Sequence, residues 1–270
     1  MKIVVIGGSG LVGSKLVTTL RHRGHEVLSA SRRSGVNTLT GQGLQHAVNG
    51  AAVVIDVINS PTFEGTDVLE FFRTSTRNVV AAAEAARVKH HVVLSIVGTD
   101  RMLASMYFQA KMMQERWVGV SPIPHTILRS TQFFDFLPRI AAAEGDPRIV
   151  RVPPVSVQPI AADEVAAALA DLAMATPRNG MIEHGGPELL RLDDIVRRAM
   201  RAVRDPRLVI ADPTARYFGA ELKEDTLTPD EGAIVGVTSF DEWLKGLIAS
   251  KSQRDMISAR DSYVRDLTLT

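Results

Sequence analysis

The stretch that decides the fold stands at the start of the chain: Lys2-Ile3-Val4-Val5-Ile6, followed directly by Gly7-Gly8-Ser9-Gly10-Leu11-Val12-Gly13. The apolar, β-branched run predicts a buried strand, and the helical spacing of apolar residues from Leu11 onward predicts a helix after the turn. The glycines fit two overlapping patterns, Gly7-x-x-Gly10-x-x-Gly13 and Gly8-x-Gly10-x-x-Gly13. A strand that enters a helix through such a turn is typical of the first unit of a βαβ fold.

The same alternation continues through the first half of the chain. Short apolar runs predict strands at residues 2–6, 26–30, 52–58, 91–97 and 125–128. Longer segments with helical periodicity predict helices at residues 11–23, 67–87 and 107–118. Strands that alternate with helices of this length indicate a parallel sheet covered on both faces. We therefore predict an α/β fold with a doubly wound, Rossmann-type sheet formed mainly by residues 1–145.

The pattern changes past residue 145. Residues 152–159 form an extended stretch with three prolines, and two helices are expected at 164–175, capped by Asp163, and at 192–203. A turn is expected at Gly185-Gly186-Pro187. Residues 146–249 are therefore expected to form a small carboxyl-terminal substrate lobe interleaved with the sheet. Residues 250–270 are polar and weakly periodic, and are expected to form a loosely ordered tail.

The composition excludes several classes of protein. The 270 residues carry a net charge of only +1, with 31 basic and 30 acidic residues mixed along the chain, so a nucleic-acid partner is not expected. No apolar run is long enough for a membrane span or a signal peptide, and the absence of cysteine suits the cytoplasm. Without cysteine or clustered carboxylates, His90, His91 and His125 are not expected to bind a metal. The expected partner is a small-molecule substrate; the oligomeric state stays open, with a homodimer as one option.

The glycine turn also predicts a ligand-binding site. The first glycine permits the tight turn, Gly10 lets the backbone approach a pyrophosphate, and Gly13 lets the helix pack close to the strand. The amide-rich helix N-terminus then faces the phosphates. The whole turn, Gly7 to Gly13, is therefore predicted to bind a dinucleotide; the alternative is a turn that is merely tight.

The end of the second strand indicates which dinucleotide. An acidic residue there would bind the ribose hydroxyls of NAD(H), but the sequence places Ser31, Arg32 and Arg33 at this point. Guanidinium groups pair well with a 2′-phosphate, so NADP(H) is favoured over NAD(H). The alternative is that both arginines are ordinary solvated loop charges.

A tyrosine and a lysine suggest catalysis. Tyr107 and Lys111 are four residues apart and share one face of the expected helix. A phenol titrates at about pH 10, and a nearby cation brings its pKa toward the working range of a general acid. Ser95 lies at the carboxyl end of the preceding strand, where open α/β sheets hold their ligands. An amphipathic tyrosine beside a surface lysine is the alternative reading.

These features carry a resemblance to a known family. The chain resembles the short-chain dehydrogenases/reductases, and is similar to their atypical, nitrogen-metabolite-repressor-like (NmrA-like) branch of NAD(P)-binding proteins. The resemblance covers nearly everything from Met1 to about Leu244. Besides the glycine turn, it rests on residues 94–98, 107–111, 128–133 and 158–166.

The resemblance implies a role for each residue. Tyr107 would protonate a carbonyl oxygen as hydride arrives, Lys111 would lower the phenol's pKa and hold the nicotinamide ribose, and Ser95 would polarise the carbonyl. Asn59 would lie beside the adenine ribose or the pyrophosphate. The family's catalytic asparagine has no certain counterpart in this sequence. Asn78 is the only candidate for it. The nicotinamide pocket would be lined by Thr131, Gln132 and Phe133.

Three functions remain open at this stage. The leading one is an NADP-dependent oxidoreductase that reduces a carbonyl or quinone, since serine, tyrosine and lysine are all present. A binding protein that senses NAD(P)H without turnover is the alternative, because members of the NmrA-like branch act in that way. A sugar-nucleotide epimerase or dehydratase is disfavoured, because such enzymes normally have a longer carboxyl-terminal lobe.

Overall fold

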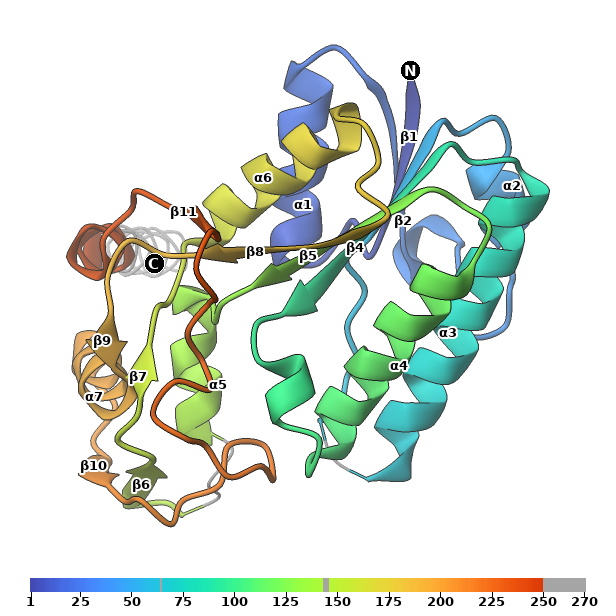
Figure 1. Cartoon of the computed structure of the whole chain (residues 1–270). Coiled ribbons are helices and arrows are strands. Elements are labelled where there is room, and N and C mark those ends of the chain that lie inside the picture. Colours follow the sequence, from blue (N-terminus) through green and yellow to red (C-terminus); the bar gives the residue numbers. More distant parts are fainter. Residues whose placement is uncertain (64, 143–145, 250–270) are drawn as a thin grey trace, which may run out of the picture.

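A parallel seven-stranded sheet forms the centre of the molecule (Figure 1). The computed structural model describes residues 1–63, 65–142 and 146–249. In sheet order the strands are β11 (Ile234–Val235), β8 (Gly180–Gly185), β5 (His125–Ser130), β4 (His90–Ile96), β3 (Val53–Asp56), β1 (Lys2–Ile6) and β2 (Glu26–Ala30). Every neighbouring pair is parallel, so all these strands end at the same edge of the sheet.

Helices cover both faces of this sheet. The alternation of side chains along β1 shows why its sequence is apolar throughout: Ile3 and Val5 pack toward the helices on one face, whereas Val4 and Ile6 pack toward those on the other. The helices on the first face are α1 (Leu11–His22) and α6 (Ala162–Met174). Those on the other are α2 (Leu44–Val48), α3 (Thr66–Ala85) and α4 (Met106–Val120). The predicted doubly wound α/β sheet is therefore confirmed.

The carboxyl-terminal region adds a smaller layer beside the sheet (Figure 1). It contains the parallel pair β6 (Ile149–Val152) and β10 (Leu208–Ala211) and the antiparallel pair β7 (Ser156–Val157) and β9 (Leu190–Arg191). Its helices are α5 (Leu137–Ala142) and α7 (Leu192–Ala202), which pack together. The chain returns to the main sheet through α6, β8 and β11, so the two parts are interleaved. The predicted tail, residues 250–270, lies outside the described residues.

Several elements predicted for the carboxyl-terminal half differ in the structure. Helix α6 begins at Ala162 with Ala161 at the N-cap, and Asp163 lies in its first turn, where its carboxylate pairs with Lys15 Nζ at 2.8 Å. Gly185 ends strand β8 instead of opening a turn. Strand β8 escaped prediction because Glu183 and His184 interrupt its apolar run, and only its pairing with β5 makes it a strand.

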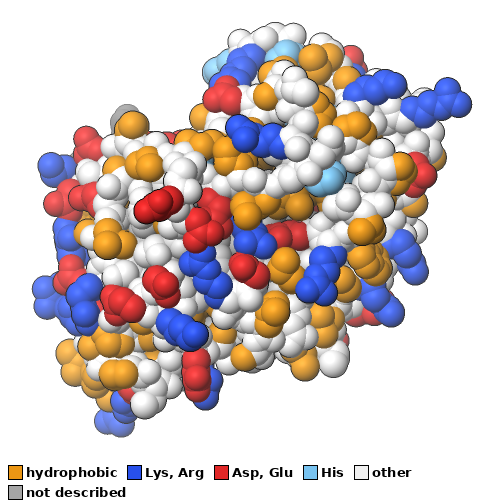
Figure 2. All heavy atoms as spheres, in the orientation of Figure 1, with side chains coloured by type: hydrophobic (Ala, Val, Ile, Leu, Met, Phe, Trp, Pro, Cys, Tyr) orange, Lys and Arg blue, Asp and Glu red, His pale blue; other side chains and the backbone are white. Residues whose placement is uncertain are grey.

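The outer surface is mixed in charge. On the face that Figure 2 shows, acidic and basic side chains are interspersed with apolar ones. Within the described ranges, no helix combines the length and the hydropathy that a bilayer crossing requires. The same ranges contain no cluster of histidine and carboxylate side chains suited to a metal ion.

Candidate functional site

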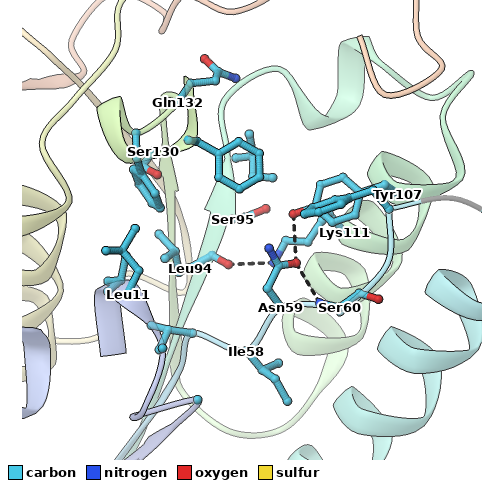
Figure 3. A pocket seen from close by; sticks show the side chains of 18 of the residues that line it. Leu11, Ile58, Asn59, Ser60, Leu94, Ser95, Tyr107, Lys111, Ser130 and Gln132 are labelled. Carbon is cyan, nitrogen blue, oxygen red and sulfur yellow. Dashed lines mark hydrogen bonds between the residues drawn. The ribbon is translucent and has the colours of Figure 1, made fainter. Parts of the chain in front are cut away.

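A cavity of about 680 Å³ opens at the edge where the parallel strands end (Figure 3). Open α/β sheets hold ligands at this edge because loops from several strands and helix N-termini converge there. Its walls come from the glycine turn, the turn after β3, the ends of β4 and β5, the start of α4, the short 3-10 helix η3 (Phe134–Phe136), and residues 217–218 of the carboxyl-terminal region.

The glycine turn leaves no room for side chains. Gly7 has a φ of +83°, a conformation that favours glycine, and its N–H donates to Ala30 O at 2.9 Å. A Cβ on Gly13 would stand 2.2 Å from Gly7 O, so α1 can begin this close to β1 only with glycine there. Gly10 is the N-cap of α1 and has no side chain to cap the helix, so amide groups of the first turn stay free for a ligand.

The seven residues of the turn divide into two groups. The cavity is lined by Gly7, Ser9, Gly10, Leu11, Val12 and Gly13. Gly8 faces β2 instead, where a Cβ would stand 2.5 Å from Ser29 Oγ. Gly8 therefore serves the packing of the turn against β2.

Ser31, Arg32 and Arg33 lie directly after β2 and do not line the cavity. Ser34 Oγ accepts from Ser31 N and donates to Ser29 O, which closes the short 3-10 helix η1 (Arg32–Ser34). Both arginines are exposed, and neither forms an ion pair within the described part of the chain. Two exposed guanidinium groups without an ion pair in the described residues therefore follow β2, outside the cavity lining.

Asn59 and Tyr107 meet inside the cavity (Figure 3). The Tyr107 hydroxyl donates to Asn59 Oδ1 at 3.1 Å, and Ser60 N donates to the same oxygen at 2.9 Å. Tyr107 is 5% exposed, and burial raises the pKa of its phenol above the ordinary value, against a smaller lowering by Asn59. The phenol is therefore a fully protonated group whose proton is aimed by the turn after β3.

Lys111 is anchored below Tyr107 in a buried polar network. Its Nζ donates to Leu94 O at 2.8 Å and to Gln114 Oε1 at 2.5 Å, and Gln114 Nε2 donates to Asp56 Oδ2 at 3.1 Å. Burial lowers the pKa of Lys111 to about 8, although the Asp56 and Glu115 carboxylates oppose the shift. Burial likewise raises the pKa of Asp56. Of the three N–H groups of the ammonium, one is left for a ligand.

This network corrects one expectation. Lys111 was predicted to bring the pKa of Tyr107 down, yet the pKa of the phenol is raised, and its hydrogen bond runs to Asn59. The two hydrogen bonds of the ammonium run to the strand and to its own helix instead. Burial outweighs any effect of the cation because both side chains are almost completely enclosed.

Ser95 requires a second correction. Its hydroxyl donates to Glu115 Oε1 at 2.5 Å, and Arg129 holds the same carboxylate with Nε at 3.0 Å and an NH2 group at 2.7 Å. A hydroxyl has one proton to give, and a carboxylate is a stronger acceptor than a carbonyl. Ser95 is therefore not arranged to polarise a substrate carbonyl; it belongs to a buried ion-pair network that joins β4, α4 and β5.

The residues after β5 lie where they were predicted, on the cavity wall. Thr131, Gln132 and Phe133 all line it. Gln132 is 6% exposed, yet neither its amide nitrogen nor its amide oxygen meets the criteria for a hydrogen bond within the described residues. The buried hydroxyl oxygen of Thr131 also has no hydrogen bond there. Because buried polar atoms are normally paired, these orphaned groups indicate that a polar ligand belongs beside them.

Asn78 is excluded from the site. Its Nδ2 donates to Thr38 O at 2.8 Å and to Leu39 O at 3.2 Å, which ties α3 to the loop after β2. Its role is structural.

Comparison with known proteins bears on this cavity. A family model described as NAD(P)H-binding matches residues 7–176. The chain belongs to this NAD(P)H-binding family. Among curated proteins, no relative matches the sequence significantly.

Solved structures that resemble this NAD(P)H-binding chain share its fold. A short-chain dehydrogenase/reductase superfamily protein from Agrobacterium tumefaciens with bound NAD superposes with a TM-score of 0.71 at 19% identity, covering 96% of this chain and all of the other. A dTDP-4-dehydrorhamnose reductase from Bacillus anthracis in complex with NADP gives 0.66 at 13% identity, covering 92% and 99%. A UDP-N-acetylglucosamine 4-epimerase from Bacillus cereus gives 0.64 at 14%, covering 93% and 99%. Chain length therefore does not separate this protein from the epimerases, contrary to the expectation from the sequence.

The residues present fit a nicotinamide dinucleotide. Glycines let the turn fold tightly so that the amides at the start of α1 stay free for a diphosphate, and buried polar atoms of Thr131 and Gln132 lie in the wall of the same cavity. Free amides and buried polar groups in one cavity are what an extended, polar cofactor requires.

The site also contains aromatic residues that were not predicted from the sequence. Phe63, Tyr217 and Phe218 all line the cavity. The only local signal for the last two is an aromatic pair directly before Gly219 in a weakly patterned segment. Phe63 carries no such signal, because it follows β3 in an irregular turn.

Proposed function

We propose that this NAD(P)H-binding protein is an NADP(H)-dependent oxidoreductase that reduces a carbonyl or quinone group of a small molecule, with Tyr107 as the proton donor. One observation carries the proposal: a buried, protonated phenol, aimed by Asn59, lies in the same cavity as a glycine cradle for the cofactor. When bound, the reduced cofactor would supply the hydride.

Each part of the cavity then has a task. The amides of the glycine turn would hold the diphosphate, and the remaining N–H of Lys111 would hold the nicotinamide ribose. Thr131 and Gln132 would bind the polar edge of the nicotinamide with their buried polar atoms. Ser95 also lines the cavity, but its proton is donated to Glu115.

The raised pKa of Tyr107 determines the protonation state of the phenol. At neutral pH the phenol keeps its proton, which is the state that a general acid needs. Oxidation of an alcohol would use the phenolate, the form that burial disfavours.

The preference for NADP(H) rests on Arg32 and Arg33. Both are exposed, and neither has a partner carboxylate among the described ion pairs. A 2′-phosphate at the end of β2 would supply the missing negative charge.

A second function is favoured by one observation. The Ser95 proton is committed to Glu115, so the serine–tyrosine pair of a working reductase is incomplete. An NmrA-like sensor that binds NADP(H) and signals to a partner without turnover would tolerate this loss.

One experiment separates the two functions. Calorimetry measures NADPH binding to the purified protein, and absorbance follows NADPH oxidation with a panel of aldehydes, ketones and quinones. The reductase requires turnover that falls by about a hundredfold or more in Tyr107→Phe, since a general acid contributes roughly that much. Met106→Leu, an exposed neighbour on α4, is the matched control. Tight NADPH binding without turnover on any substrate identifies the sensor, and absence of NADPH and NADH binding rejects both.

A further inference from the structure

A line of buried hydrogen bonds runs from the cavity to the end of β3. Lys111 Nζ donates to Gln114 Oε1 at 2.5 Å, and Gln114 Nε2 donates to Asp56 Oδ2 at 3.1 Å. The exposed fractions are 3% for Lys111, 0% for Gln114 and 1% for Asp56, and of these three residues Lys111 lines the cavity. Gln114 therefore connects a buried carboxylate to the ammonium at the cavity wall.

The chemistry of the three groups allows one direction along this line. An ammonium only donates hydrogen bonds and a carboxylate only accepts them, so the amide of Gln114 turns its oxygen to Lys111 and its nitrogen to Asp56. The second oxygen of Asp56 accepts from Ile58 N at 3.0 Å. Burial raises the pKa of Asp56, and its two hydrogen bonds and the charge of Lys111 oppose this shift. Both oxygens act as acceptors, as in an ionised carboxylate.

The charge of Asp56 is available to balance that of Lys111. A buried ammonium needs a negative partner because burial removes it from water. Two carboxylates oppose the effect of burial on the pKa of Lys111, Asp56 on β3 more strongly than Glu115 on its own helix α4. Glu115 is already paired with Arg129, whose Nε and NH2 groups donate to it at 3.0 and 2.7 Å. The hydrogen bonds of Asp56 described above come from neutral groups, so they leave its charge unbalanced.

Uncharged groups fix the position of the ammonium. Lys111 Nζ donates to Leu94 O of β4 at 2.8 Å (Figure 3). It also lies 5.1 Å from the centre of the Phe72 ring of α3, a distance at which a ring face attracts a cation. Tyr107, one turn earlier on α4, stays neutral because burial raises the pKa of its phenol. With Leu94 and Gln114 as acceptors, one N–H of the ammonium is left for a ligand.

We propose that Asp56 is a positioning residue of the cofactor site: through Gln114 it keeps Lys111 protonated and in place, so that the remaining N–H of the ammonium can bind the ribose next to the nicotinamide. Removal of the Asp56 charge would therefore weaken cofactor binding most at the pH where Lys111 loses its proton. This inference rests on the proposed function, because it takes NADP(H) as the ligand of Lys111.

The titration of Lys111 itself is the first measurement. Nuclear magnetic resonance follows isotope-labelled lysine in the full chain without cofactor, and the Lys111 signal is assigned by its absence in Lys111→Arg. The pKa of Lys111 is about 8 in the wild type. Asp56→Asn removes the charge and keeps the size of the side chain, so the pKa of Lys111 should fall by about one unit or more.

The second measurement is NADPH affinity as a function of pH, from the fluorescence of the bound cofactor. In the wild type the affinity should fall above about pH 8, where Lys111 loses its proton. In Asp56→Asn this fall should begin about one pH unit lower, so that NADPH binds about fivefold more weakly than to the wild type at about pH 8 and nearly equally at about pH 6.5. A purely structural role of Asp56 would weaken binding by the same factor at both values.

An exchange of charge between the two positions supplies the decisive variant. In Asp56→Asn combined with Gln114→Glu, the new carboxylate at position 114 accepts directly from Lys111, and the new amide at position 56 donates to that carboxylate and accepts from Ile58 N. The double variant should therefore return the pKa of Lys111 to about 8 or above and recover the NADPH affinity of the wild type at that pH.

Two further variants complete the comparison. Glu84→Gln, exposed on α3, controls for the loss of one negative charge and should leave both measurements unchanged. Gln114→Met interrupts the line without removing a charge and should lower the pKa of Lys111 in the same direction as Asp56→Asn. It replaces Asp56→Asn should that variant lose its native circular dichroism.

The outcomes separate this inference from the function on which it rests. An unchanged pKa of Lys111 in a natively folded Asp56→Asn, or a natively folded double variant that does not recover it, overturns the inference and leaves the reductase intact if turnover persists. NADPH affinity that changes by the same factor at every pH also overturns it. NADPH binding that follows the pKa of Lys111 in these variants, without turnover on any carbonyl, supports the inference and rejects the reductase.

Discussion

Tyr107 donates its hydroxyl proton to Asn59 Oδ1 at 3.1 Å, across 48 positions of sequence. Asn59, in the turn after β3, therefore determines where the hydroxyl proton of Tyr107 on α4 points. The neutral amide oxygen of Asn59 positions the phenol but does not compete for its proton as a carboxylate would.

Removing this acceptor is expected to slow the chemical step. Asn59→Ala deletes two neutral hydrogen bonds, from Ser60 N and from the Tyr107 hydroxyl. The one that positions the phenol is worth about 1 kcal/mol, so kcat should fall about fivefold, with a smaller change in KM for the carbonyl substrate. Steady-state kinetics with saturating NADPH make the measurement. Thr62→Ala, in the same turn but exposed, is the control. A change in KM alone would assign Asn59 to binding instead.

Ser95 is expected to matter for stability more than for turnover. Ser95→Ala removes a hydrogen bond to a carboxylate, so the free energy of unfolding should drop by about 2 kcal/mol, while kcat stays within about threefold of the wild type. Urea denaturation and steady-state kinetics test the two parts. Glu115→Gln is expected to cost more, about 3 kcal/mol or above, because it removes the buried carboxylate that faces Arg129 and leaves the half-exposed Asp100 as its ion-pair partner. A loss of kcat of a hundredfold in Ser95→Ala would return a catalytic role to the serine.

Gly13 should tolerate no side chain. The Cβ of Gly13→Ala would stand 2.2 Å from Gly7 O, so this variant should lose about 2 kcal/mol or more of stability and most of its affinity for NADPH. Gly119→Ala is a matched control, since Gly119 lies in α4 and a Cβ there meets no atom within 4 Å. The control should be neutral or slightly stabilising because alanine favours helices. Equal stability of both variants would contradict the tight packing at the turn.

Arg32 and Arg33 should distinguish the two cofactors. The double variant Arg32→Ala/Arg33→Ala is expected to weaken NADPH binding by at least about tenfold and NADH binding by less than about twofold. Arg116→Ala, exposed on α4, controls for the general loss of positive charge. Calorimetry at constant ionic strength measures all three proteins. Equal losses for the two cofactors would leave both arginines without a role at the 2′-phosphate.

His91 should make the fold sensitive to acid. Burial lowers its pKa to about 4, and neither ring nitrogen has a hydrogen bond within the described residues. Between about pH 6.5 and pH 4 the unfolded chain binds a proton that the folded chain does not, so stability should fall as the pH decreases through this window. The loss approaches about 3 kcal/mol at its lower end, since one pKa unit corresponds to about 1.4 kcal/mol.

Denaturation at several pH values tests this sensitivity. His91→Leu is expected to reduce the slope between pH 6.5 and pH 4, because one titrating group is gone, while burial also lowers the pKa of His90 and of His184. His46→Leu, exposed on α2, should keep the wild-type slope. An unchanged slope in His91→Leu would assign the acid sensitivity to other groups.

The sequence by itself determined the parallel, doubly wound sheet and the glycine cradle. Both depend on short-range patterns: strand and helix periodicity, and the spacing of Gly7, Gly10 and Gly13 within one turn. The same patterns located the ends of β4 and β5 and the start of α4, so the residues predicted there do lie at the cavity. They failed for β8 and β11, whose sequences become strands only by pairing with strands already formed.

Only the tertiary structure decided how the side chains of the site divide their hydrogen bonds. Ser95 gives its proton to Glu115, twenty positions away, and Tyr107 gives its proton to Asn59. The Phe218 ring reaches the cavity from a strained turn in the carboxyl-terminal region. Hydrogen bonds and ring contacts act over a few ångströms, so they depend on which distant segments the fold brings together, and no local pattern contains that information.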